Sequence, residues 1–158
     1  MDARFRTEEG RLKLRVTGII IHNNKILLET YEDGVYCFPG GTINLNETSE
    51  EAIIRELKEE IDKDFVIDSL VSIYEEFYKS NKDEKTHCIN FYYKMNFKDE
   101  NDINSIDMNR LENDHGYMNQ HHYKWVDIND LESVKLLPEI IKKDIIAGEY
   151  SDHLIIKG

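Results

Sequence analysis

The chain is poor in several residue types, and each shortage excludes a class of protein. Its 158 residues include only two prolines and two cysteines. Cys37 and Cys88 form no CxxC pair and have no histidines at zinc-finger spacing, so we expect reduced thiols rather than a disulfide or a zinc site. No apolar run approaches the roughly 20 residues of a membrane-spanning helix, and the first residues lack the apolar core of a signal peptide. We therefore expect a soluble, cytoplasmic protein that does not enter a membrane.

Basic residues are outnumbered as well. Lys and Arg total 20 against 32 Asp and Glu, which gives a net charge of -12. Proteins that bind DNA or RNA usually carry a basic surface, so this balance argues against a nucleic-acid partner. A phosphate-bearing small molecule would also be repelled, unless a divalent metal ion intervened. The length predicts one domain over residues 1–158, and a homodimer is left open.

The hydrophobic pattern predicts a mixed α/β fold. Apolar and polar residues alternate from Leu12 to Val16, as in a half-buried strand. Similar reasoning predicts strands at 12–21, 25–29, 35–38, 69–79, 86–97 and 123–126, with turns at 23–24 and 32–34. A helix is predicted over 49–61, opened by a Thr48–Glu51 capping box, and another from Pro138 to Gly148. Residues 98–120 show no clear period and are predicted to form a loop, while 151–158 give no signal.

The first predicted helix carries three carboxylates on one side. At 100° per residue, Glu56, Glu59 and Glu60 fall within an arc of roughly 100°, beside the apolar stripe of Ile53 and Leu57. Like charges this close repel each other, and a hard divalent cation would relieve the repulsion. The alternative is an ordinary solvated acidic face, since Glu is a strong helix former.

The spacing upstream favours the metal site. Five residues separate Gly41 from Glu47, and seven more separate Glu47 from the run Arg-Glu-Leu-Lys-Glu-Glu at 55–60. This pattern resembles the signature of the Nudix hydrolase family. The lead-in Pro39-Gly40-Gly41 and the later pairs Trp125-Val126 and Leu137-Pro138 are also similar to that family. Asp62 stands where the family has glycine, and Asp tolerates the left-handed conformation better than most residues.

The resemblance implies a fold, an activity and roles for individual residues. It implies an α/β/α sandwich around a mixed sheet, and hydrolysis of a phosphoanhydride bond in a nucleoside diphosphate linked to another moiety. Glu56, Glu59 and Glu60 would bind Mg²⁺, or alternatively Mn²⁺, with the Gly41 backbone beside them. Glu47 and Arg55 would brace the loop against the helix.

Several features outside the signature are left with open alternatives. The substrate could be a nucleotide sugar or ADP-ribose, a nucleoside triphosphate or a dinucleoside polyphosphate. The alternative to an enzyme is an inactive Nudix-fold domain that binds nucleotides or regulates.

The general base and the substrate contacts are also open. Asp114 and His122 are the candidates for an additional base, from a loop that also holds Glu112, His115 and His121, and Glu59 or Glu60 could activate the water instead. Four aromatic residues either stack on a base or belong to the core: Tyr31, Tyr36, Phe77 and Tyr78. Four arginines either neutralise a distal phosphate or form a solvated strand end, which is the favoured interpretation: Arg4, Arg6, Arg11 and Arg15.

Overall fold

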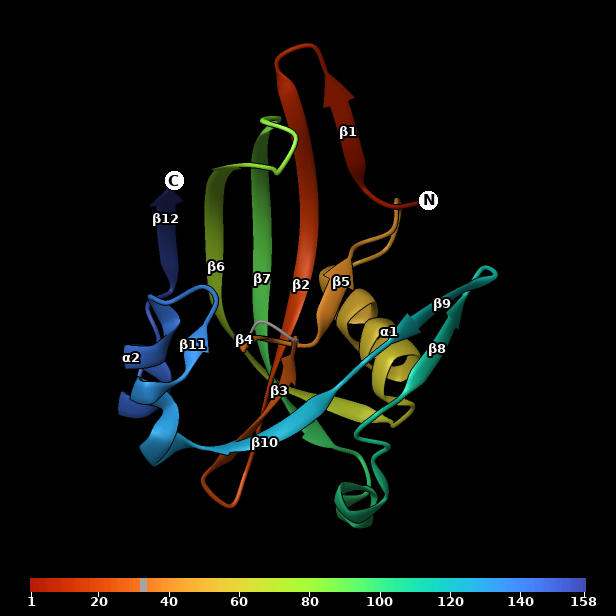
Figure 1. The fold of residues 1–158 in the computed structure, drawn as a ribbon, viewed down its shortest axis with the longest axis vertical. Coiled ribbons are helices and arrows are strands. Elements are labelled where there is room, and N and C mark those ends of the chain that lie inside the picture. The colour runs from red at the N-terminus through yellow and green to blue at the C-terminus, as the bar shows by residue number, and fades with distance from the viewer. Residues whose placement is uncertain (32–33) are drawn as a thin grey trace.

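One large mixed β-sheet organises the molecule in the computed structural model, which describes residues 1–31 and 34–158 (Figure 1). Within these residues the strand order is β11-β4-β3-β2-β7-β6-β12, with β1 and β5 also paired to β2 and β10 paired to β3. The pairs β2–β7, β6–β12 and β4–β11 are parallel, whereas the remaining pairs are antiparallel. The predicted mixed α/β class is therefore confirmed.

The bounds of the elements are as follows. The strands are β1 (Arg4–Thr7), β2 (Gly10–His22), β3 (Lys25–Thr30), β4 (Val35–Cys37), β5 (Gly40–Thr42), β6 (Phe65–Lys79), β7 (Lys85–Phe97), β8 (Leu111–Asp114), β9 (Tyr117–Gln120), β10 (Tyr123–Asp127), β11 (Lys135–Leu136) and β12 (His153–Lys157). The α-helices are α1 (Ser49–Ile61) and α2 (Ile141–Ala147), and two 3-10 helices are η1 (Glu100–Ser105) and η2 (Ile128–Ser133).

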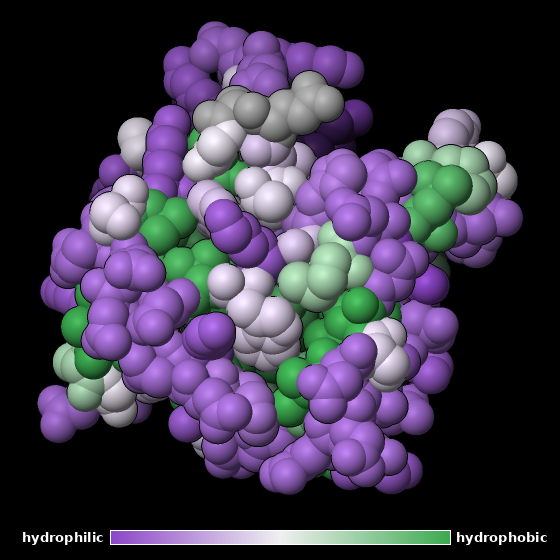
Figure 2. Space-filling model, turned by 60° about the horizontal axis from the view of Figure 1, so that its bottom comes forward, coloured by the Kyte–Doolittle hydropathy of each residue, from purple (hydrophilic) through white to green (hydrophobic). Residues whose placement is uncertain are grey.

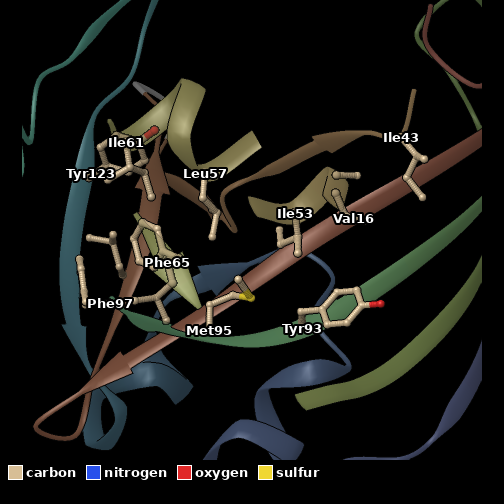
Figure 3. Close-up of a cluster of buried hydrophobic side chains, with 13 residues drawn as sticks. Val16, Ile43, Ile53, Leu57, Ile61, Phe65, Tyr93, Met95, Phe97 and Tyr123 are labelled. Carbon is tan, nitrogen blue, oxygen red and sulfur yellow. The ribbon is translucent and has the colours of Figure 1, made fainter. Parts of the chain in front are cut away.

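The two α-helices cover opposite faces of the sheet. Neighbouring residues of a strand point to opposite sides, so Ile20 packs in one cluster and Ile19 in the other. The first cluster joins α1 to β2, β7 and β10, and Figure 3 shows Ile53 and Leu57 of the helix pointing at the strands below. The second cluster joins α2 and η2 to the other face. This is the α/β/α arrangement that the sequence predicted.

Local signals define both ends of α1. The Thr48 hydroxyl accepts a hydrogen bond from the Glu51 backbone, and the Glu51 side chain accepts one from Thr48, which forms the predicted capping box. At the other end, Asp62 adopts a left-handed conformation with φ 61° and closes the helix as a glycine would. The predicted stripe is buried at Ile53 and Leu57, but Ile54 is 43% exposed because it lies 100° further round.

Other predictions of secondary structure were incomplete or wrong. The segment 98–120 is not a plain loop: it contains η1 and the β8–β9 hairpin, which projects beside α1 in Figure 1. Residues 153–157, which gave no signal, form β12, and β6 begins at Phe65 rather than Ser69. Helix α2 begins at Ile141, so Pro138 lies before it rather than in its first turn. The turn predicted at 32–34 lies outside the described residues at Glu32 and Asp33.

Hydrophilic residues dominate the surface. Figure 2 shows a face on which hydrophilic side chains predominate and hydrophobic ones lie in small groups between them. Among the described residues, no helix has the length and apolar character that crossing a membrane requires.

The core position of α1 can be tested with two substitutions on the same helix. We expect Leu57→Ala to lower the free energy of unfolding by roughly 2–5 kcal/mol, because Leu57 is fully buried between α1 and the sheet. Ile54→Ala should cost less than about 1 kcal/mol because Ile54 is partly in water. Urea denaturation of both variants measures this, and equal losses would contradict the packing of α1.

Candidate active site

The acidic side of α1 meets the sheet at two consecutive glycines. Gly40 and Gly41 lie on β5, paired with Thr17 and Val16 of β2. A Cβ on Gly41 would lie 2.2 Å from the carboxyl carbon of Glu56, so any side chain there would displace that carboxylate. The Gly40 backbone N–H donates a hydrogen bond of 3.1 Å to Glu60 Oε2. Glycine thus lets the backbone of β5 lie directly against two of the predicted site residues.

Arg55 links these carboxylates to the preceding loop. Its Nε and Nη2 donate to both oxygens of Glu47, at 2.6 and 2.9 Å, and Nη2 also donates to the Thr42 carbonyl. Its Nη1 donates to Glu56 at 2.9 Å and lies 3.3 Å from Glu59. The guanidinium therefore holds the loop at 42–47 against α1 with a two-bond fork, which is the strongest geometry for this ion pair.

The carboxylates of the site differ in pKa because their surroundings differ. Hydrogen bonds from Arg55 hold the pKa of Glu47 below its ordinary value. Burial instead raises the pKa of Glu56, and it raises that of Glu60 well above the ordinary value. Glu59 is about half exposed, with 48% of its side chain accessible. Among the described residues Glu60 has no ion-pair partner: Glu29 and Glu56 repel its charge, and the one cation that acts on it, His121, is already bonded to Glu29 and Glu112.

A second cluster adjoins Glu60, and it joins distant parts of the chain. His121 Nδ1 lies 2.6 Å from Glu29 of β3, and Nε2 lies 2.6 Å from Glu112 of β8. An ionised carboxylate can only accept hydrogen bonds, so two such contacts fit an imidazolium that donates from both nitrogens. Hydrogen bonding to Glu29 is the main reason that the pKa of His121 rises to about 9. His121 in this arrangement has no free nitrogen with which to accept a proton.

A cavity of about 670 Å³ extends from these two clusters across the sheet. Glu60, Glu29, His121 and Gly40 line one end, and the far end reaches Arg15 on β2. Its walls include five aromatic residues and part of the final strand: Tyr31, Phe38, Phe77, Tyr78, Tyr92 and Ile156. The volume lies within the range of small-molecule sites.

The two candidates for an additional base lie elsewhere. Asp114 is exposed at the end of β8, and its ion-pair partner is His115 at 3.8 Å. His122 is exposed, and its Nδ1 lies 2.9 Å from Asn109. Neither residue lines the cavity, whereas the adjacent His121 does. The structure therefore brings together Gly41, Glu47, Arg55, Glu56, Glu59 and Glu60 but not Asp114 or His122.

The residues present suit a divalent cation. As the side chains lie, no group of three His, Cys, Asp or Glu surrounds a single point in residues 1–31 and 34–158, because Arg55 lies between Glu56 and Glu59. Yet Glu60 is partly buried with no ion-pair partner of its own in the described residues, and Gly41 leaves room only for the Glu56 carboxylate. Hard oxygen donors in excess of positive charge are the donor set that magnesium prefers.

Comparison with known proteins decides the family. Residues 12–147 match the family model described as NUDIX domain. The chain belongs to the NUDIX domain family. It is also 35% identical over 82 residues to a protein of Methanocaldococcus jannaschii named ADP-ribose pyrophosphatase, a match that spans 49% of this chain and 47% of that relative. The chain therefore matches about half the length of this Nudix-related protein.

Solved structures support the Nudix fold. A MutT protein from Bacillus halodurans superimposes with a TM-score of 0.63 at 15% identity, covering 90% of this chain and 85% of that one. A NUDIX hydrolase from Nitrosomonas europaea gives 0.61 at 16% identity, covering 96% and 80%. An ADP-ribose pyrophosphatase from Streptococcus suis gives 0.58 at 15% identity, covering 90% and 98%. At such identities the likeness concerns the fold alone.

Sequence reasoning missed the Glu29–His121–Glu112 cluster of this Nudix domain. His121 and Glu112 stood among the loop residues considered, but Glu29 was taken as the end of a strand. One signal was present: Glu29 directly follows Ile26-Leu27-Leu28, a run apolar on both faces, so an acid there enters the interior and needs a partner. Which histidine would supply that partner depended on the path of the β8–β9 segment.

The charged state of His121 predicts how stability changes with pH. Its pKa is raised from 6.5 to about 9, so its stabilisation is fully present below about pH 6.5 and is lost as the pH rises through about 9. We expect His121→Gln to lower the free energy of unfolding at pH 6 and to have a smaller effect at pH 9.5. Denaturant titration at both values measures this, with the exposed neighbour variant His122→Gln as the control. A cost that is the same at both pH values would contradict the imidazolium assignment.

Proposed function

We propose that the protein is a Nudix pyrophosphohydrolase, which uses water to cleave a phosphoanhydride bond in a nucleoside diphosphate linked to another moiety. One observation carries the proposal: Glu60, which is partly buried and has no ion-pair partner among the described residues, lies on the acidic side of α1 and lines a cavity of about 670 Å³. Membership of the NUDIX domain family and the named relative support this interpretation.

The proposed cofactor is Mg²⁺, with Mn²⁺ as the alternative. Glu56, Glu59 and Glu60 would hold it, next to the Gly41 backbone. When bound, such an ion neutralises charge on the phosphate oxygens and favours attack at phosphorus. It also removes the repulsion between an acidic protein and an anionic substrate.

The residues of the chain have separate proposed tasks. Arg55 and Glu47 fix the loop that follows Gly41 and β5, and thereby set the distance between β5 and α1. The Gly40 N–H orients the Glu60 carboxylate. Glu59 is the most exposed carboxylate of the three on the helix and is therefore best placed to accept a proton from the attacking water.

The proposed substrate is of the ADP-ribose type, because two similar proteins carry that name. The cavity offers aromatic faces such as Tyr31 and Tyr78 on which a base could stack. Nucleotide sugars, nucleoside triphosphates and dinucleoside polyphosphates belong in the same assay panel, with and without Mg²⁺. We further propose that residues 1–158 act as one domain on a small molecule, without a nucleic-acid partner.

The metal assignment can be tested with a pair of isosteric variants. We expect Glu59→Gln to reduce the rate roughly 100-fold or more while the fold is retained, because a neutral amide supplies no charge to the site. Glu50→Gln is the control, since it removes the same charge from an exposed position on the same helix. The measurement is the rate of product formation at several Mg²⁺ concentrations.

Two outcomes would count against the proposal. A near-normal rate for Glu59→Gln would remove Glu59 from the site. No metal-dependent turnover of any compound in the panel would favour the alternative, a Nudix-fold domain that binds nucleotides without cleaving them.

A further inference from the structure

Basic side chains form a row on the sheet face that bears the cavity. Arg11, Lys13 and Arg15 alternate along β2 with Leu12 and Leu14, so the three share one face. At about 3.3 Å per residue, the row is roughly 13 Å long. It continues in line with Thr17, which lines the cavity between Arg15 and the site residues of β5. The basic residues are therefore arranged in a line that leads away from the carboxylates of α1.

The row has more positive charge than its surroundings neutralise. Within the described parts of the chain, the side chains of Lys13 and Arg15 make no ion pair or hydrogen bond. The Nε atoms of Arg11 and Arg15 are buried without a hydrogen-bond partner. Arg11 has a long ion pair, 3.8 Å, to Glu84, and its Nη2 donates a hydrogen bond of 3.5 Å to the Thr86 hydroxyl. Burial and the neighbouring arginines lower the pKa of Lys13. An anionic ligand bound beside these side chains would relieve the repulsion between their positive charges.

One carboxylate faces the row, but it does not pair with it. Glu76 of β6 is opposite Cys88 of β7, which is in turn opposite Lys13. Burial raises the pKa of Glu76, and its oxygen accepts a hydrogen bond from Tyr92 at 3.5 Å. Two acids, Glu76 beside Arg15 and Lys13 and Glu84 beside Arg11, against three cations leave a net positive strip in a protein whose net charge is -12.

The two ends of the row each line a cavity. Arg15 lines the cavity of about 670 Å³ that holds Glu60, and Arg11 lines a neighbouring one of about 600 Å³. Both cavities are bounded by Phe77, Tyr78 and Gly158, so they adjoin along the same strands. Arg15 and Arg11 therefore border two adjoining cavities, while Lys13 lies between them on the strand and lines neither.

We propose that this basic row binds an anionic group at the end of the substrate remote from the bond that is cleaved. The inference rests on the proposed function and narrows its substrate class to nucleoside diphosphate derivatives whose far end carries a phosphate or a carboxylate. A half-buried guanidinium without a partner is costly, and an anion held by Arg15 and Lys13 supplies the missing hydrogen bonds.

Matched substrates test the row. The first set is ADP-ribose and two phosphorylated forms of it. One carries the added phosphate on the terminal ribose, and the other, ADP-ribose 2′-phosphate, carries it on the adenosine ribose. The second is UDP-glucose and UDP-glucuronate, which differ by a carboxylate. We expect kcat/KM to favour an anionic member of at least one set about tenfold, and the set that responds identifies phosphate or carboxylate as the ligand.

Variants assign that preference to the row. Combining Arg15→Gln with Lys13→Gln should reduce the ratio of anionic to neutral kcat/KM about tenfold, as expected for one charged hydrogen bond of roughly 1.4 kcal/mol. Arg15→Lys should retain most of the ratio because it keeps the charge. Lys143→Gln removes one positive charge at an exposed position of α2, as Arg15→Gln alone does on β2, and should leave the ratio unchanged.

Failure of this inference differs from failure of the proposed function. Suppose turnover depends on Glu59 but kcat/KM is the same with and without the added phosphate or carboxylate. That result would contradict the role of the basic row and leave the proposed hydrolase activity standing. If no compound is turned over, the role of the basic row is tested by calorimetric titration, which measures how tightly the protein binds each compound of the same sets. The inference is supported if the compound with the added anionic group binds more tightly and if Arg15→Gln combined with Lys13→Gln abolishes that difference. Equal binding of both compounds by the unaltered protein contradicts it.

Discussion

The forked pair between Arg55 and Glu47 is the interaction on which the rest of the site depends. Arg55 is the cation that contacts Glu47, Glu56 and Glu59 and the carbonyl of Thr42 together. Without it, four acids would repel one another across a loop that has no secondary structure of its own. Because it is held by the loop and by the helix, Arg55 converts an unfavourable cluster into a defined geometry. The glycines of β5 then allow the backbone to close against that geometry.

The parts of the fold that were predictable are those whose signals are local. Helix α1 follows from a capping box, an apolar period of 3.6 and a residue that tolerates the left-handed conformation, all within 15 positions of the chain. Strand β12 was not predictable, since its short segment becomes a strand only by pairing with β6. The β8–β9 hairpin has the same origin: four residues on each side, all exposed except Glu112, pair with each other and leave no hydrophobic alternation to detect.

The candidate site divides in the same way. Six residues lie within 20 positions of the chain, so their spacing alone indicated that they act together: Gly41, Glu47, Arg55, Glu56, Glu59 and Glu60. The cluster around His121 could not be found by spacing, because Glu29 and His121 are 92 positions apart. His121 and His122 lie in the short connection between β9 and β10, and neighbouring residues of an extended chain point to opposite sides, so the choice between them depends on how that connection is turned.

The parallel pairing of β12 with β6 has a consequence for how the molecule folds. His153 and Glu75, which pair across these strands, are 78 positions apart, whereas α1 forms from consecutive residues. Closing a long loop costs entropy before the new contacts repay it, so non-local strand pairs form late. Ile156 and Gly158 form part of the cavity wall. We therefore expect the acidic helix and the β6–β7 hairpin to form early, and the substrate cavity to be among the last features to take shape.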